Sequence, residues 1–237
     1  MIFVAALAVI LSLLAAERLW PARSEPTDRW RNFQAYGLIL LAELTLLPAV
    51  TLTASVEQLT VIDLATWPAI LGIAAFTLAM DGAEFAFHRV QHAVPLLWRM
   101  HALHHSDPNM NATTTLRHFW GDPLIKSVTI WPAVALLLKP TPLIVGVYVV
   151  IGLFNYFLHA NLRIDFGRWS WVLNSPAYHR RHHSVEAAHH NCNFAAIFPL
   201  FDVLCGTYRR PDGFPRTGMD SRPRGLVETA LWPLKAR

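Results

Sequence analysis

Histidines are the residues of this chain whose type and spacing could do chemistry. Eight of the twelve histidines lie in three short clusters, one of the form HxxxH and two of the form HxxHH. Residues three and four positions apart share one face of a helix, about 5–6 Å apart at Cβ. Each cluster can therefore direct two or three imidazoles at one point, and imidazole is the commonest metal-binding side chain. The spacing predicts a metal centre. The clustered residues are His88, His92, His101, His104, His105, His179, His182 and His183.

The number of histidines indicates two metals rather than one. Two metals with four or five nitrogen ligands each need about nine or ten imidazoles, and imidazole suits iron through changes of redox state. His159, which follows a long apolar segment, is the ninth candidate ligand. His118 is expected to support the site rather than bind metal, and His189 and His190 lie either in a plain polar loop or beside the ligands. A pair of metals that activates dioxygen requires redox-active iron rather than zinc.

The composition indicates a membrane protein. Hydrophobic residues make up 54% of the 237 residues and charged residues only 15%, whereas soluble domains average about 25% charged residues. We expect a single membrane-embedded domain, residues 1–237, with a C-terminal surface tail at 209–237. The first apolar segment is short for a span, which usually needs about 17–25 residues. The four predicted spans are residues 1–16, 36–54, 67–87 and 124–158.

The distribution of charge predicts the orientation of these spans. Four arginines lie between Glu17 and Asn32, whereas the loop at 55–66 is acidic and has no Lys or Arg. Under the positive-inside rule the first loop is cytoplasmic and the loop at 55–66 is external. Two prolines at 140 and 142 break the last apolar segment into a hairpin. All three histidine clusters and His159 are then expected on the cytoplasmic side.

Several other functions fit the sequence less well. The formal charge of +4 comes from arginines spread over loops, which argues against nucleic-acid binding. Cys192 and Cys205 form no CxxC pair and are expected to be free thiols in a reducing compartment. No HExxH motif of a zinc metalloprotease occurs, and no nicotinamide or flavin fingerprint. A haem electron carrier needs one or two axial histidines, and a transporter places its ligands near the midplane. Both remain as alternatives of another class.

The order of the three clusters, split by an apolar hairpin, resembles the fatty acid hydroxylase/sterol desaturase superfamily of integral-membrane di-iron enzymes. Asp81 matches the acidic residue that this superfamily places before the first histidine box. The segment Asn111–Arg117 resembles the stretch after the second box, and His159-Ala-Asn161 matches an isolated HxN. Asp202–Tyr208 resembles the terminal D-x-x-[FW]-G-T signature, and Glu17–Pro21 resembles the segment after the first helix. The resemblance covers roughly Glu17 to Tyr208.

A few positions depart from the pattern of that superfamily. Asn191–Ala195 stands where Asp-x-Asn-Tyr-Gly is common, and Phe85 replaces a tyrosine before the first box. Arg117–Asp122 replaces the usual R-x-H-x-x-E. These changes leave all three boxes intact and concern the residues around the ligands.

The resemblance implies an all-α integral membrane bundle of about four transmembrane helices, with a cytoplasmic helical cap that carries the histidine boxes. It implies two non-haem irons held by the nine histidines, with Asp81 and Asn161 orienting ligand imidazoles or adjacent groups. The reaction would use O2 and an external reductant, delivered by a ferredoxin or a cytochrome b5-type carrier with its reductase. The substrate would be a bilayer lipid (sterol, fatty acyl, isoprenoid or ether lipid), hydroxylated or desaturated at an unactivated C–H bond. Carotenoid hydroxylases carry similar boxes and remain an alternative; in a bacterium the membrane would be the inner one. Further candidates for positions beside the ligands are His118, His189, His190 and Asn193.

Overall fold

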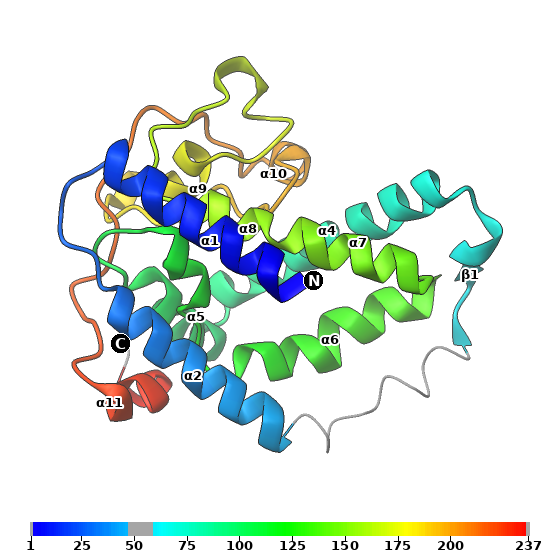
Figure 1. Ribbon diagram of the computed structural model, residues 1–237, viewed down its shortest axis with the longest axis horizontal. Helices are drawn as coiled ribbons and strands as arrows, with labels where there is room; N and C mark the ends of the chain where they lie inside the picture. Colours follow the sequence, from blue (N-terminus) through cyan, green and yellow to red (C-terminus); the bar gives the residue numbers. More distant parts are fainter. Residues whose placement is uncertain (1, 47–58, 236–237) are drawn as a thin grey trace.

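The computed structural model describes residues 2–46 and 59–235. The described chain is helical, with one pair of two-residue parallel strands in which Ile62 lies opposite Leu138. Figure 1 shows α4, α6 and α7 extending toward one end of the molecule, while α5, α9 and α10 gather toward the other. The larger elements are α1 (Ile2–Leu19), α2 (Arg29–Leu46), α4 (Ala69–Ala93), α5 (Pro95–His105), α6 (Asp122–Leu137), α7 (Pro142–Gly152), α8 (Phe154–His159) and α9 (Pro176–His182). The short ones are β1 (Ile62–Asp63), η3 (Leu64–Thr66), η4 (Ala112–Leu116), β2 (Leu138–Lys139), η5 (Gly167–Trp169), η6 (Ala187–His189), α10 (Leu200–Leu204), α11 (Leu226–Ala230) and α12 (Trp232–Lys235).

Two helical stretches in the described part of the chain are long and apolar enough to cross a membrane. They are Ala69–Ala93, which is α4, and Pro142–His159, which joins α7 and α8. With a rise of 1.5 Å per residue, the 25 residues of α4 extend about 37 Å, against a hydrocarbon core of about 30 Å. Four spans with a cytoplasmic cap remain a prediction.

An apolar core lies between α4, α6 and α7. Phe76 and Met80 of α4 are buried against Ile130 of α6 and Ile144 of α7. Tyr148 of α7 meets the Phe76 ring edge to face, with the centroids 5.5 Å apart. Aromatic pairs of this geometry add to the energy of area burial. The packing fixes the helices that lead to the histidines.

The first two helices differ from the predicted apolar segments. Helix α1 continues beyond residue 16 to Leu19, and Glu17 is buried within it. Helix α2 starts at Arg29, seven residues before the predicted segment 36–54. Residues 47–54 of that segment, and 55–58 of the predicted external loop, lie outside the described residues. Hydropathy located the helices but missed their polar ends, because those ends hydrogen-bond to the segment around η4 and to Asn161.

The last turns of α4, α5 and α9 carry the three histidine clusters. Helix α4 continues past the apolar segment to Ala93, so His88 and His92 lie on its last turns. Helix α5 starts at once with Pro95 at its first position, where the fixed φ of proline suits a helix start. Helix α9 is likewise short, with Ser175 accepting a capping hydrogen bond from the backbone N–H of Tyr178 at 3.3 Å.

The predicted surface tail at 209–237 is wrong for its last part. Helices α11 and α12 form there, and Trp232 is only 2% exposed. Its ring belongs to a core cluster with Met100 and Leu103 of α5 and with Phe119. Two short helices carry too few turns for an apolar period to be visible in the sequence. The C-terminal segment therefore supports the helix that carries the second cluster.

Candidate metal centre

The structure brings the nine predicted histidines together in two groups. The ligand nitrogens of each group all lie within 4.8 Å of one another. Group one contains residues from the end of α4, from α5 and from α9, and group two contains residues from α5, the end of α8 and the end of α9. Group one is His88, His92, His101, His105 and His182. Group two is His104, His159, His179 and His183.

Each HxxHH cluster is divided between the two groups, whereas the spacing alone suggested that a cluster shares one point. His101 and His105 face group one, and His104 of the same helix faces group two. In the third cluster His179 and His183 face group two, and His182 faces group one. The helical pattern explains the division, because residues four apart are nearly in line along a helix while the residue between them is turned aside.

Backbone carbonyl oxygens fix the orientation of three rings. The Nδ1 atom of His88 lies 2.7 Å from the carbonyl oxygen of Phe194, and that of His159 lies 2.7 Å from the carbonyl oxygen of Asn155. The Nδ1 atom of His182 lies 2.8 Å from the carbonyl oxygen of Cys192. A carbonyl oxygen accepts only, so each Nδ1 carries the proton and each Nε2 presents a lone pair. Metal-binding histidines are held in this way.

The Nε2 atoms converge in a way that hydrogen bonds alone do not satisfy, because one imidazole nitrogen makes one hydrogen bond and several of these atoms have two Nε2 neighbours. The Nε2 atom of His159 lies 3.0 Å from that of His104 and 2.9 Å from that of His179, which is 3.2 Å from that of His183. In group one the Nε2 atom of His101 lies 3.0 Å from that of His88 and 3.2 Å from that of His105. The lone pairs of these nitrogens point at one another, with too few protons to pair them all. A cation bound in each group would satisfy them.

Two further nitrogens support this fit. The Nε2 atoms of His92 and His182 are buried and have no hydrogen-bond partner among residues 2–46 and 59–235. A buried polar atom without a partner is costly and usually has an explanation. A metal ion in group one would satisfy both nitrogens.

The protonation states agree with metal binding. Burial, followed by the neighbouring imidazoles, holds the pKa values of five histidines well below their usual range; they are His101, His104, His105, His179 and His183. Burial also lowers the pKa of His182 to about 4. Neutral imidazole is the form that binds metal, so these rings are ready to act as ligands near neutral pH.

Comparison with known families matches residues 73–207 to the fatty acid hydroxylase model, more than half of the 237 residues. The chain belongs to the fatty acid hydroxylase family. The matched range contains all nine histidines of the two groups and the signature from Asp202 to Thr207.

Several curated proteins are similar to this fatty acid hydroxylase domain. Alkylglycerol monooxygenase of Xenopus tropicalis is 30% identical over 131 residues, which is 55% of this chain and 29% of that protein. Ornithine lipid hydroxylase OlsE of Rhizobium tropici is 28% identical over 145 residues, 61% of this chain and 44% of that protein. Cholesterol 25-hydroxylase of Mus musculus is 29% identical over 144 residues, 56% and 45% respectively. The chain thus spans less than half the length of these relatives. No solved structure matches it.

The residues expected to orient the imidazoles act one step further away. Both carboxylate oxygens of Asp81 accept backbone hydrogen bonds, from Ile197 and Phe198 at 2.9 Å. Asp81 therefore holds the loop that also contains Phe194, whose carbonyl oxygen anchors His88. Asn161 likewise makes no hydrogen bond to an imidazole among the described residues: its Oδ1 accepts from Arg180 at 2.9 Å, and its Nδ2 donates to the carbonyl oxygen of Arg23 at 2.7 Å. Both residues thus hold groups adjacent to the histidines, which is one of the two roles expected for them.

The other candidates around the ligands have different environments. His118 stacks on His104, with ring centroids 4.1 Å apart, and its Nδ1 lies 3.5 Å from Asp122. His189 is buried, with its Nδ1 2.9 Å from the hydroxyl of Ser184, whereas His190 is exposed. Asn193 has a left-handed backbone, with φ 57°. Its side chain bonds the backbone of Tyr178 and Arg209 and so ties the loop after α9 to the segment after α10.

A buried carboxylate at Asp202 organises the loop beside group one, a role that the matched signature alone did not disclose. One oxygen accepts from the backbone N–H of Phe194 at 3.0 Å and the hydroxyl of Thr207 at 2.6 Å. The other accepts from the backbone N–H of Ala195 at 2.7 Å and the hydroxyl of Tyr178 at 2.6 Å. Through Phe194, this residue sets the carbonyl oxygen that holds His88.

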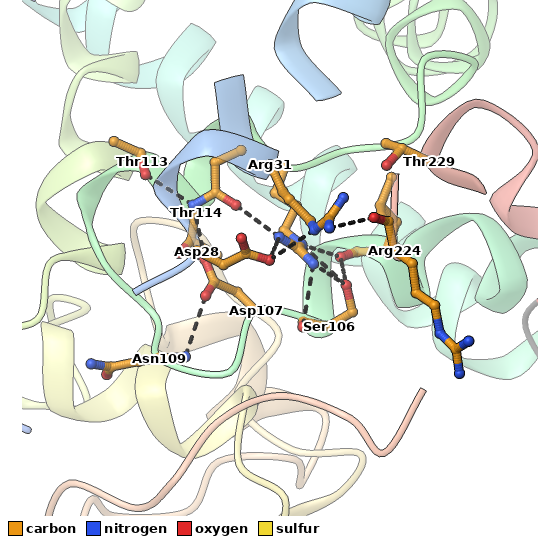
Figure 2. Close-up of polar contacts among 12 residues, drawn as sticks. Asp28, Arg31, Ser106, Asp107, Asn109, Thr113, Thr114, Arg224 and Thr229 are labelled. Atoms are coloured by element: carbon orange, nitrogen blue, oxygen red, sulfur yellow. Dashed lines mark hydrogen bonds and ion pairs between the residues drawn. The ribbon is translucent and has the colours of Figure 1, made fainter. Parts of the chain in front are cut away.

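Arg117 plays a corresponding part at the end of α5. The side chain is completely buried, and it donates to the carbonyl oxygen of Leu103 at 3.2 Å and to the hydroxyl of Ser106 at 2.9 and 3.1 Å. It also reaches Asp28 at 3.2 Å and Asn32 of α2 at 3.1 Å. Figure 2 shows these contacts continuing to Asp107, Thr113 and Thr114. The network anchors the helix of His101, His104 and His105 to α2 and η4.

Two cavities border the histidines. The first, of about 190 Å³, is lined by members of both groups together with residues of α4, α6 and α7. The second, of about 310 Å³, is lined by His92, His105, His182 and His183 together with Trp98, Asn191 and Met219. The first cavity borders the apolar helices and the second borders the C-terminal segment. The centre can thus be reached from two sides.

Proposed function

We propose that this chain is an O2-dependent, non-haem di-iron oxidoreductase that hydroxylates an unactivated C–H bond of a membrane lipid. The observation that carries the proposal is the division of nine imidazoles, seven buried and two half-buried, into two groups whose ligand nitrogens lie within 4.8 Å of one another. Membership of the fatty acid hydroxylase family supports lipid hydroxylation. The names of its relatives, which include a monooxygenase and two hydroxylases, support hydroxylation over desaturation.

Iron fits the donor set of both groups. The groups contain imidazole nitrogens alone, a set that suits iron and other transition metals and not magnesium or calcium. His88, His92, His101, His105 and His182 would hold one iron, and His104, His159, His179 and His183 the other. When bound, such a redox-active pair supplies the activation of dioxygen that C–H oxidation needs.

The overall reaction sets the remaining requirements. A lipid R–H, O2, two electrons and two protons give R–OH and water. Because the sequence has no nicotinamide or flavin fingerprint, the electrons are expected from a ferredoxin or a cytochrome b5-type carrier with its reductase. The protein's own part is to keep the imidazoles neutral, hold their Nε2 atoms inward through the carbonyl oxygens of Phe194, Asn155 and Cys192, and exclude bulk water.

The metal content tests this function directly. The purified protein should contain two non-haem irons per chain. His104→Ala removes a nitrogen from group two and His182→Ala one from group one, so each variant should lose at least half of the iron and all lipid hydroxylation. His190→Ala, at an exposed histidine, is the matched control and should keep both irons. Full iron content in both ligand variants, or a Soret band of haem in the native protein, would overturn the proposal.

The membrane arrangement forms part of the same proposal. We propose that α4 and α7–α8 are two of four spans and that the histidine groups face the cytoplasm. The two apolar stretches and the arginines between Glu17 and Asn32 support this orientation. A reporter enzyme that works only in the cytoplasm should be active when it is fused after Arg237. A reporter that works only outside the cytoplasm should be inactive at the same position. Activity of an externally active reporter at the same position would contradict the topology.

A further inference from the structure

The smaller cavity joins the histidine groups to an ion pair that the metal centre does not use. Its lining includes His88 and His101 of group one and His104, His159 and His179 of group two. Glu84 and Lys126 line the same cavity. Glu84 lies one helical turn before His88 on α4, so the two side chains share a face of that helix. The pair therefore lines the same cavity as members of both histidine groups.

The ion pair itself is close and bridges two helices. The Nζ atom of Lys126 on α6 lies 2.6 Å from a carboxylate oxygen of Glu84, and the two side chains are 29% and 25% exposed. Among apolar helices such a pair gains little stability over apolar residues of similar volume, because of the cost of desolvation. Ionisable groups at such places usually serve a substrate or an ion. A role in the cavity explains the pair better than a role in folding.

Lys126 has hydrogen-bonding capacity left for a ligand. An ammonium group has three N–H donors, and Glu84 is its one hydrogen-bond acceptor in the described part of the chain. Two donors are therefore free for an oxygen atom in the cavity. The charge of Lys126 is already balanced by Glu84, and Asp81 lines the same cavity, so an anionic headgroup would lie beside two carboxylates, which is costly. A neutral oxygen acceptor avoids this cost.

The size of the cavity limits what part of a lipid enters. A volume of about 190 Å³ is below the roughly 300–1,000 Å³ of sites that enclose a whole drug-sized ligand. One end of a lipid fits, with its oxygen on Lys126 and the neighbouring carbons beside His88 and His104. The rest of the chain must lie outside the cavity.

We propose that the Lys126–Glu84 pair selects lipids that carry a neutral oxygen acceptor, such as a hydroxyl or ether oxygen, close to the carbon that is oxidised. This inference rests on the proposed function, because that function supplies the reaction in which the nearby carbon is oxidised. The binding preference itself does not require iron, so it is tested by binding rather than by turnover.

The experiment measures binding of radiolabelled 1-hexadecanol and palmitate to the purified protein in detergent. The native protein should bind the alcohol about ten times more tightly than the anion, because the carboxylate of palmitate would lie beside those of Glu84 and Asp81. The loss of one hydrogen bond with a charged group lowers an affinity by a similar factor. Lys126→Met should lose about ten-fold in affinity for the alcohol. Because this variant leaves Glu84 unpaired, the double variant E84Q/K126M removes both charges and should fold normally, with the preference for the alcohol abolished. Lys139→Met, at an exposed lysine, is the control and should bind as the native protein does.

The outcomes separate this inference from the proposed function. A double variant that keeps the native ratio of affinities, or a native protein that binds palmitate as tightly as the alcohol, would overturn the role of the pair. Iron analysis on the same preparations is independent. Two irons without the preference would leave the oxygenase standing and remove this inference, whereas the preference without iron would support the inference and contradict the di-iron function.

Discussion

Replacement of Asp202 by asparagine isolates the contribution of the buried carboxylate beside group one. Its four hydrogen bonds come from the backbone of Phe194 and Ala195 and the hydroxyls of Tyr178 and Thr207. The amide oxygen of asparagine can retain two of these donors. The amide nitrogen then faces the other two donors. Because each oxygen of Asp202 accepts one backbone N–H, the N–H group of either Phe194 or Ala195 is left buried without an acceptor.

The magnitude follows from the number of bonds affected. A buried polar group without a partner costs about 1–3 kcal/mol, and each bond that loses a charged partner weakens by about 1 kcal/mol. The sum is about 4 kcal/mol, which lowers the Tm of a chain of this size by about 10 °C. Because Phe194 holds the ring of His88, the variant should also lose iron from group one.

Thermal unfolding in detergent, followed by circular dichroism, measures this loss. Asp220→Asn makes the same chemical change at an exposed position and should leave the Tm within about 2 °C, as expected for a surface substitution. If Asp202→Asn had the same Tm as the native protein, the hydrogen bonds of the carboxylate would not be holding the loop. Our account of how His88 is oriented would then fail.

Two further predictions concern the C-terminal helices and the thiols. Trp232→Ala should destabilise the protein by about 3–5 kcal/mol, because the ring is buried against Met100 and Leu103; Trp169→Ala, at a ring 57% exposed, should have little effect on the Tm, and equal effects would refute the packing. A maleimide at neutral pH should modify the exposed Cys205 quickly and Cys192 slowly, because burial raises the pKa of the Cys192 thiol, which donates to the carbonyl oxygen of His189 at 3.0 Å. Equal rates, measured by mass spectrometry, would show that Cys192 is accessible.

The sequence allowed the family and the nine histidines of the two groups to be predicted, because the family motifs and eight of these histidines depend on local spacing. Both cysteines are free, as expected. The functions of Asp81, Asn161 and Asp202 could not be read in the same way. Asp81 and Asn161 bond backbone atoms far away along the chain, at Ile197 and Phe198 and at Arg23. Asp202 bonds the backbone of a loop seven and eight residues before it, which has no regular secondary structure. Motif matching marks such residues as present, but only the fold shows which atoms they hold.

Polar helix ends were the other weakness of prediction from hydropathy. Glu17 extends α1 beyond its apolar segment because its carboxylate is buried and bonded, accepting from the backbone N–H groups of Ala112 and Asn161 at 2.7 and 2.8 Å. A salt bridge to Arg29 at 2.8 Å completes its partners. A stretch of apolar residues ends at a charged residue such as Glu17. The helix nevertheless continues, because the hydrogen-bond and ion-pair partners of Glu17 compensate for its buried charge.

The division of both HxxHH clusters between the two groups has a mechanical consequence. His104 faces group two while His101 and His105 of the same helix face group one, and α9 repeats the arrangement in reverse. A rotation of α5 about its axis therefore displaces nitrogens of both groups at once. Loosening the anchors of α5, Arg117 at its end and Trp232 along its side, should disturb both metals together. Loss of the Phe194 carbonyl contact should instead act first on His88 and group one. Iron counted separately in the two groups would distinguish a fault in the helix from a fault in the loop.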